Sequence, residues 1–351
     1  MRSSGVFAVC LAFSAFDAQP MYEVIDLTEM FGERFLANDI NDQGVVGANI
    51  RLNDHQNQAC VVENGQLRML PKYMGHPWGL SDLADNGDAL GHDPLGTDSQ
   101  HSIFYRNGKV FDMNLPAGPQ FPAARGLNNL AQVTGRVFGR PFIWEDGNID
   151  YLGSPEDRGG GSSINDSGVV AGAINVDDGG PTLHAARWIE GKLYDINPSW
   201  SDFSESGEIN ELGEIAGMAF VTGGGQRPVL WRDGKAIDLG DFGNVGKAYD
   251  VNDRSQVVGW SNDSQGILHG FLWEKGNLYK LADLVAGGTD YRITLGVAVN
   301  DAGQVLAGGG LRGEARWLVL NPVPEPSALI SLALAICALT ISRRSRRRRS
   351  Q

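Results

Sequence analysis

The segment Ala248–Leu281, AYDVNDRSQVVGWSNDSQGILHGFLWEKGNLYKL, is the unit from which most of this chain is built. It contains a polar turn (Asn252–Ser255) and then a short apolar strand that ends at Gly259. A variable loop, an aromatic strand around Trp273, a tight turn and a closing strand follow. Variants of this unit recur along almost the whole chain, so the sequence predicts a repeat protein.

The polar turn has seven copies. They begin at Asn41, Ala84, Asn128, Asn165, Asn210, Asn252 and Asn300, at intervals of 37 to 48 residues. Asn, Asp and Gly tolerate the left-handed backbone of tight turns, which explains why they recur where one strand reverses into the next. With almost no helical periodicity and four short strands per unit, this period is typical of a propeller blade. We therefore predict an all-β, seven-bladed β-propeller of four-stranded blades over residues 20–321.

One aromatic position recurs in the second half of the unit. Its copies with tryptophan are Trp144, Trp188, Trp231, Trp273 and Trp317. Because an indole ring buries a large apolar area, we expect these side chains to form the cores of the blades. A tryptophan stripe that binds sugars is the alternative, and it would require exposed rings.

The last copy of the unit lacks its closing strand. After Trp317 the chain continues through Leu318–Leu320 directly into a proline-rich segment. The missing pattern occurs instead before the first copy, at Tyr22–Leu27 (YEVIDL). We predict that this N-terminal strand pairs with the last blade and closes the ring, because closure removes exposed sheet edges. An open β-solenoid with a free terminal strand is the alternative.

Both ends of the chain have the character of targeting segments. Residues 1–19 combine Arg2, the apolar run Val6–Phe13 and small residues after it, which predicts a signal peptide. A misassigned start or a disordered tail is the alternative. Residues 322–351 combine a proline-rich segment, the uncharged run Ala328–Ile341 and six arginines within Arg343–Arg349. This order predicts a transmembrane helix with a basic end in the cytoplasm. The alternatives are a buried core helix and a nucleic-acid-binding tail.

The net charge of the chain is −13, and setting aside the six terminal arginines leaves −19. So acidic a body would repel phosphates, which argues against nucleic acid as a partner.

The tail resembles the PEP-CTERM sorting signal of Gram-negative bacteria. The matching residues are Pro324, Glu325 and Pro326, followed by the apolar run and the terminal arginines. The resemblance implies that an exosortase-type enzyme recognises and cuts the tail. The protein would be anchored in the inner membrane before processing and lie at the cell surface or outside the cell afterwards. Such proteins are associated with exopolysaccharide or biofilm production.

The body resembles the HAF-type extracellular repeat family. The segments that carry this resemblance include Ile164–Val170 with His184–Trp188, and Val251–Asp253 with His269–Trp273. The resemblance implies an extracellular location, but it transfers no activity and no functional residues.

No catalytic constellation stands out. His101, His184 and His269 share one repeat position, which favours a half-buried ring bonded to the backbone of a neighbouring blade. Gly159–Gly161 and Gly223–Gly225 are expected to be flexible loops, because no phosphate-binding context surrounds them. The Asn-Asp-x-Gly turns lack the spacing of calcium loops, so turn chemistry explains them, and calcium remains open as a cofactor.

Acidic pairs such as Asp82 with Asp85, Glu205 with Glu208 and Asp177 with Asp178 are common. The sequence does not give the distances on which glycoside hydrolysis depends. The leading hypothesis is therefore a non-catalytic binding or structural protein of the cell envelope that contacts exopolysaccharide or a surface protein. A secreted glycan hydrolase or lyase on a propeller scaffold is the alternative.

Overall fold

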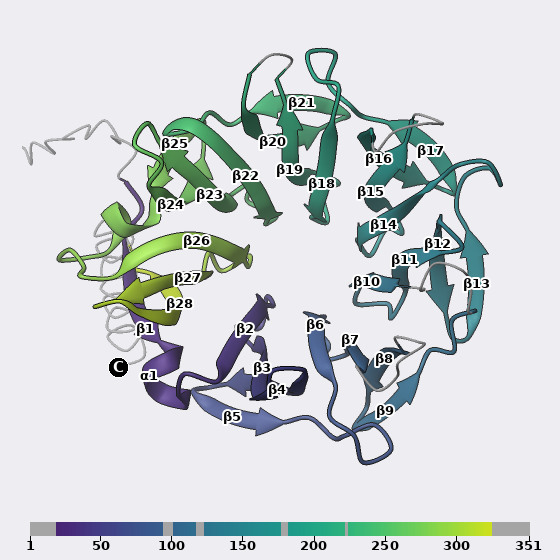
Figure 1. The fold of residues 1–351 in the computed structure, drawn as a ribbon, viewed down its shortest axis with the longest axis horizontal. Helices are drawn as coiled ribbons and strands as arrows, with labels where there is room; N and C mark the ends of the chain where they lie inside the picture. The colour runs from purple at the N-terminus through teal and green to yellow at the C-terminus, as the bar shows by residue number, and fades with distance from the viewer. Residues whose placement is uncertain (1–18, 94–100, 117–122, 177–181, 222–223, 325–351) are drawn as a thin grey trace, which may run out of the picture. The chain divides into compact units, whose positions relative to one another are not determined.

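A computed structural model describes residues 19–93, 101–116, 123–176, 182–221 and 224–324. Tyr22–Pro322 forms one compact unit in which seven four-stranded antiparallel sheets surround a central axis (Figure 1). Each sheet runs from an inner strand at the axis to an outer strand at the rim. The predicted seven-bladed propeller is confirmed.

The first three blades use consecutive strands, which follow one another from the axis outward. Blade 1 contains β2 (Phe35–Ile40), β3 (Val46–Asn53), β4 (Gln56–Glu63) and β5 (Gln66–Met69). Blade 2 contains β6 (Gly79–Leu83), β7 (Ala89–Asp93), β8 (His101–Arg106) and β9 (Lys109–Asp112). Blade 3 contains β10 (Ala123–Leu127), β11 (Val133–Val137), β12 (Arg140–Glu145) and β13 (Asn148–Tyr151).

The next three blades follow the same order. Blade 4 contains β14 (Gly159–Ile164), β15 (Val170–Asn175), β16 (Leu183–Ile189) and β17 (Lys192–Asp195). Blade 5 contains β18 (Ser204–Ile209), β19 (Ile215–Phe220), β20 (Gln226–Arg232) and β21 (Lys235–Asp238). Blade 6 contains β22 (Gly243–Val251), β23 (Val257–Asp263), β24 (Leu268–Glu274) and β25 (Asn277–Lys280).

Blade 7 combines both ends of the compact unit. Its strands are β26 (Arg292–Val299), β27 (Val305–Leu311), β28 (Glu314–Pro322) and β1 (Tyr22–Asp26). Two short helices flank this blade, α1 (Leu27–Phe31) and the 3₁₀ helix η1 (Leu281–Leu284). The Asp26 side chain caps α1 by accepting a hydrogen bond from the Glu29 amide at 2.9 Å.

Left-handed residues fix the hairpins at the positions that the repeat pattern indicated. In blades 1 to 6 the turn between the third and fourth strands has two residues with positive φ, the second always glycine, as in Lys275 (φ 51°) and Gly276 (φ 84°). This geometry matches the twist of the flanking strands. The turns between the first and second strands also place their fourth residue at positive φ, including the non-glycine residues Ala131 and Ser255.

The recurring glycine of the second strand makes room for the aromatic ring of the third. A Cβ on Gly217 would lie 2.8 Å from the Trp231 ring, and one on Gly172 would lie 2.9 Å from the Trp188 ring. These separations are too short for real side chains, so the glycine allows each indole to lie across its own sheet.

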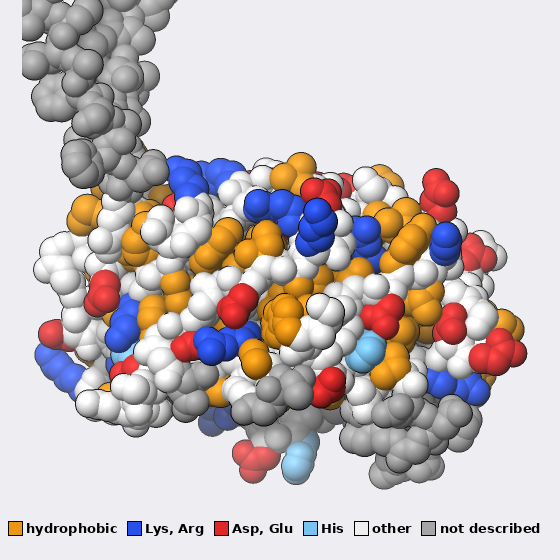
Figure 2. Space-filling view, turned by 90° about the horizontal axis from the view of Figure 1, so that it is seen from above, with side chains coloured by type: hydrophobic (Ala, Val, Ile, Leu, Met, Phe, Trp, Pro, Cys, Tyr) orange, Lys and Arg blue, Asp and Glu red, His pale blue; other side chains and the backbone are white. Residues whose placement is uncertain are grey.

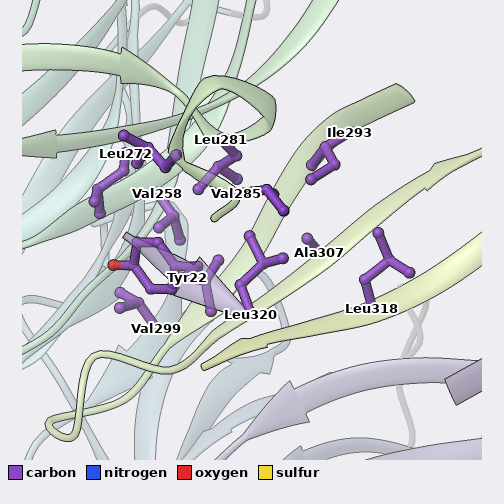
Figure 3. Close-up of a cluster of buried hydrophobic side chains, with 12 residues drawn as sticks. Tyr22, Val258, Leu272, Leu281, Val285, Ile293, Val299, Ala307, Leu318 and Leu320 are labelled. Carbon is purple, nitrogen blue, oxygen red and sulfur yellow. The ribbon is translucent and has the colours of Figure 1, made fainter. Parts of the chain in front are cut away.

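The N-terminal strand closes the ring as predicted. β1 pairs with β28 in antiparallel register, with Val24 opposite Leu320 and Ile25 opposite Val319. The Tyr22 ring is 1% exposed and lies in an apolar cluster with Val258 of blade 6 and Leu320 of blade 7 (Figure 3). The first strand of the chain therefore joins the last blade to its neighbour.

The rim of the ring carries a mixture of side chains. Figure 2 shows hydrophobic groups interspersed with basic and acidic ones along this edge. Isolated apolar side chains of this kind are ordinary on a soluble surface.

The predicted signal peptide and most of the predicted sorting tail lie outside the described residues. Pro324 is exposed at the end of the described chain, whereas Glu325 and Pro326 fall beyond it. No helix within the described ranges is long and apolar enough to cross a membrane. The predicted span over Ala328–Ile341 also falls outside those ranges.

Substitution of Tyr22 tests whether β1 stabilises the closed ring, and substitution of Ile25 on the same strand is the matched control. We expect Tyr22→Ala to lower the free energy of unfolding by roughly 3–5 kcal/mol, as for other large buried side chains. Ile25 is 41% exposed, so Ile25→Ala should cost less than about 1 kcal/mol. Urea unfolding measures both. Equal losses would mean that β1 does not hold the ring closed.

Candidate functional site in the central channel

Carboxylates join neighbouring blades where the inner strands end. Asp82 accepts hydrogen bonds from its own neighbour Leu83 at 2.8 Å and from Leu127 of blade 3 at 2.7 Å. Asp250 does the same with Val251 and with Val299 of blade 7, both at 2.7 Å. The equivalent residues in chain order are Asp39, Asp82, Gly126, Ser163, Glu208, Asp250 and Ala298. We call these the clasp positions.

A second set of side chains forms an unbroken circle at the turns. At the second residue of each polar turn, the backbone N–H donates to the side chain of the equivalent residue in the next blade, at 2.7–2.9 Å. The last of these bonds runs from Asp301 to Asp42 and so links blade 7 to blade 1. The members of this mouth ring are Asp42, Asp85, Asn129, Asp166, Glu211, Asp253 and Asp301.

The first residue of each turn adds a parallel set of bonds. The Asn252 amide donates to the Asn300 carbonyl at 2.8 Å, while its oxygen accepts from Gln256 in its own turn. The Asn300 amide continues the series across the closure to the Asn41 carbonyl at 2.9 Å. Ala84 interrupts the pattern in blade 2, where the Asn86 amide reaches the next blade instead.

Six of the seven clasp positions and five of the seven members of the mouth ring line a cavity of about 240 Å³ in the central channel, the exceptions being Gly126, Asp253 and Asp301. Eight carboxylates line it, against the single cation Arg125. Enclosure, followed by repulsion from Asp39 and then Glu208, raises the pKa of Asp82 well above its ordinary value. Asp39 and Asp82 both accept from the Leu83 amide, at 3.1 and 2.8 Å, which brings two carboxylates to one donor.

Other carboxyl groups of the channel are shifted in the same direction. Burial is the main cause that raises the pKa of Glu208 to about 7 and that of Asp42 to about 6. Burial and then the charge of Glu208 raise the pKa of Asp250. The channel therefore holds protons at a pH where free carboxyl groups are ionised.

Residues of blades 3 to 6, from their inner strands and from β11, β15 and β16, line a larger cavity of about 520 Å³. Its charged residues are Arg125, Arg136, Arg158, Lys247 and Glu205. Lys247 Nζ lies 3.0 Å from Glu205 Oε2, so these two charges pair with each other. We call this cavity the basic pocket.

The prediction that Gly159–Gly161 is a flexible loop was wrong, because these residues begin the inner strand β14. A Cβ on Gly159 would lie 2.2 Å from the Ala173 carbonyl oxygen, and one on Gly161 would lie 2.1 Å from Thr134 Oγ1. The glycines are there because neighbouring groups approach too closely for side chains. Gly224 and Gly225 do lie in a loop, and Gly223 falls outside the described residues.

The tryptophans of the repeat lie in or against the blade cores. Trp144, Trp188, Trp231 and Trp273 are between 1% and 8% exposed, whereas Trp317 is half-buried. The Trp231 indole donates to the Ile196 carbonyl at 2.7 Å.

The expected contacts of the repeated histidines were wrong. His101 contacts Asp112, and His184 contacts Asp195 at 2.7 Å, each on the outer strand of the same blade. His269 contacts Asp263 of its own blade at 3.0 Å, and this contact is the main cause that lowers the pKa of Asp263. A charged carboxylate within reach binds the imidazole more strongly than a neutral carbonyl does, so these ring nitrogens contact an acidic side chain of their own blade.

The acidic pairs of the sequence separate in space. Asp82 and Asp85 both line the channel cavity, whereas Glu205 lies in the basic pocket and Glu208 in the channel. Asp177 and Asp178 fall outside the described residues. Within the described ranges no three His, Cys, Asp or Glu side chains are arranged to hold a metal ion.

The fold defines the class of this protein as a seven-bladed β-propeller closed by its N-terminal strand. No family model and no curated protein matches the chain. It is similar to the β-propeller domain of the trilobed protease from Pyrococcus furiosus, which has an open velcro topology. The two share 12% sequence identity with a TM-score of 0.54, and the match covers 72% of this chain and 82% of that domain. It is also similar to YCF48 in a structure bound to a D1 peptide, with 13% sequence identity and a TM-score of 0.51. This match covers 88% of this chain and 96% of YCF48. These similarities show the fold alone.

The raised pKa values predict that the propeller is more stable in acid than in base. A carboxyl whose folded pKa is raised stabilises the fold fully below its ordinary pKa, and this contribution is lost as the pH rises through the raised value. With pKa values of about 6 for Asp42 and about 7 for Glu208, the thermal midpoint should fall between pH 5 and pH 8. Calorimetry across this interval measures it.

Glu208→Gln keeps the shape and removes the titrating group, so its midpoint should fall less between pH 5 and pH 8 than that of the wild type. Glu63→Gln, on the exposed end of β4, serves as the control and should follow the wild-type curve. A wild-type midpoint that rises with pH would contradict the assignment.

Proposed function

We propose that this chain is an exported binding propeller of the cell envelope with a non-catalytic role, and that it holds an extracellular polysaccharide or a surface protein. One observation carries the binding part of this proposal. The basic pocket is rich in hydrogen-bond donors, yet its lining offers Ser162 and Ser206 without a histidine, and Glu205 is paired with Lys247. Nucleophilic catalysis needs a base beside the nucleophile, whereas binding needs only well-placed donors.

The location rests on the sequence. The signal-like residues 1–19, the Pro324-Glu325-Pro326 motif, the apolar run and the terminal arginines support export, a transient membrane anchor and processing by an exosortase-type enzyme. The resemblance to PEP-CTERM and HAF-type proteins supports an association with exopolysaccharide or biofilm. The matched solved structures bear on the fold only.

A glycan hydrolase or lyase is the second candidate, and the pair Asp39 and Asp82 favours it. Both side chains line the channel and accept from the Leu83 amide, and their pKa values are both raised. A proton-holding carboxyl beside an ionised one is the arrangement that general acid and base catalysis uses.

A binding assay distinguishes the two candidates. The purified propeller should retain exopolysaccharide isolated from the producing cells, and no new reducing ends or unsaturated sugars should appear during long incubation. Their appearance, and their loss in Asp39→Asn, would assign the protein to the enzymes. Failure to retain either polysaccharide or a surface protein from the same cells would contradict binding altogether.

Localisation is tested separately with a chain truncated after Asn321. We expect the intact protein to fractionate with the envelope or the extracellular matrix, because the tail anchors it for processing. The truncated protein should appear in the soluble exported fraction. Identical fractionation of both forms would contradict the role of the tail.

A further inference from the structure

We propose that the basic pocket is a site for a carboxylated polysaccharide, with Arg125, Arg136 and Arg158 as the groups that bind its carboxylates. This inference rests on the proposed binding function and names the ligand class and the site. Residues of β10, β11, β14, β15, β16, β18 and β22 line the pocket. Its volume of about 520 Å³ falls within the roughly 300–1,000 Å³ of ligand sites.

Arg136 and Arg158 line only the basic pocket, whereas Arg125 also lines the channel cavity with its carboxylates. Lys247 and Glu205 neutralise each other, and no acidic side chain of the described residues forms an ion pair with Arg125, Arg136 or Arg158. Arg136 is half-buried, and Arg158 has a single long contact, 3.5 Å, to the Pro155 carbonyl. Like charges gathered without partners repel one another, and a bound anion would remove that repulsion.

Gly160 of β14 gives Arg136 space above the strand. A Cβ added to Gly160 would lie 3.2 Å from the Cβ of Arg136. Because glycine lacks this atom, β14 leaves the aliphatic part of the Arg136 side chain uncovered. Gly159, Gly160, Gly161 and Gly172 all line the pocket. At Gly160 a ligand can therefore approach the backbone beside the aliphatic part of Arg136, which suits a broad sugar ring better than a narrow side chain.

Hydroxyl groups lie at the inner side of the pocket. The hydroxyls of Ser162 and Ser206 are 3.0 Å apart, and Ser206 also donates to the Gly172 carbonyl at 2.8 Å. Hydroxyl oxygens both donate and accept, so they match the hydroxyls of a sugar. Guanidinium groups bind carboxylates through two parallel hydrogen bonds, which suits the acid group of a uronate.

Other polyanions fit this pocket less well. Single-stranded nucleic acid is held by stacked aromatic rings, and the residues that line the pocket include none. An acidic peptide would also need apolar contacts for its side chains, but the lining offers only Leu183 and Ala173. The charge of the chain without the six terminal arginines is −19, so the local positive charge of the basic pocket would favour a polyanion over the acidic surroundings.

The experiment measures binding of the full propeller to polygalacturonate, with neutral dextran and polyglutamate as comparison polymers, at two salt concentrations. We expect polygalacturonate to bind more tightly than either, with an affinity that falls as salt rises. The Arg125→Gln/Arg136→Gln variant should lose tenfold or more. Arg158→Gln alone, at an exposed position before β14, should lose several-fold.

Arg68→Gln, on the exposed face of β5 in blade 1, removes the same charge far along the ring and should bind like the wild type. Thermal unfolding checks that each variant is folded. If the Arg125→Gln/Arg136→Gln variant does not fold, the binding of Arg158→Gln alone still tests the site. Equal binding of dextran, preference for polyglutamate, or unchanged affinity in Arg158→Gln and the double variant would overturn the site. If native exopolysaccharide still binds to these variants, the proposed function stands and only this site fails.

Discussion

A ring of seven blades holds together only if each blade is attached to the next and the last is attached to the first. In this propeller, side chains at the axis make that attachment by bonding to the backbone of the neighbouring blade. The bond from Asp301 to Asp42 is one of seven equivalent bonds, and it spans the junction between blade 7 and blade 1. On the outer side, the pairing of Val24 with Leu320 closes the same junction through the sheet itself. The rest of the architecture depends on these two kinds of contact.

Making this attachment with carboxylates has an electrostatic consequence. Clasp residues such as Asp82 and Asp250 and mouth-ring residues such as Asp42 and Asp301 bring acidic groups to one axis. Backbone N–H donors stabilise the charged forms, but enclosure and mutual repulsion raise several of their pKa values. The fold therefore retains protons in its channel, and its stability is linked to pH.

The basic pocket is chemically opposite to the carboxylate rings. Arg125 lines both the channel cavity and the basic pocket, so the two environments meet at that residue. Between these two cavities, this separation of charge favours an anion in the basic pocket. Gly160 leaves space beside Arg136, whereas Gly159, Gly161 and Gly172 are fixed by close contacts with neighbouring strands rather than by the needs of a loop.

Some of this site was visible in the sequence and some was not. The acidic second residue of each polar turn could be seen in Asp42, Asp166 and Asp253, but its bond to the next blade could not. The signal for the clasp position was the acidic residue before the last apolar residue of the inner strand, as in Asp39, Asp82 and Asp250. The basic pocket gave no signal, because Arg125, Arg136 and Arg158 occupy unrelated positions in their repeats.

The sequence by itself determined the number of blades, the four strands of each blade and the closure by the N-terminal strand, predicted at Tyr22–Leu27 and found at Tyr22–Asp26. These properties follow from local turn chemistry and from a count of complete and incomplete units. Only the tertiary structure decided which side chains meet at the axis, how the histidines pair and that Gly159–Gly161 forms a strand. The contacts at the axis join residues 37 to 48 positions apart within the chain, and the histidine contacts join residues 6 to 11 positions apart on facing strands. Both depend on distances in three dimensions that a linear pattern does not contain.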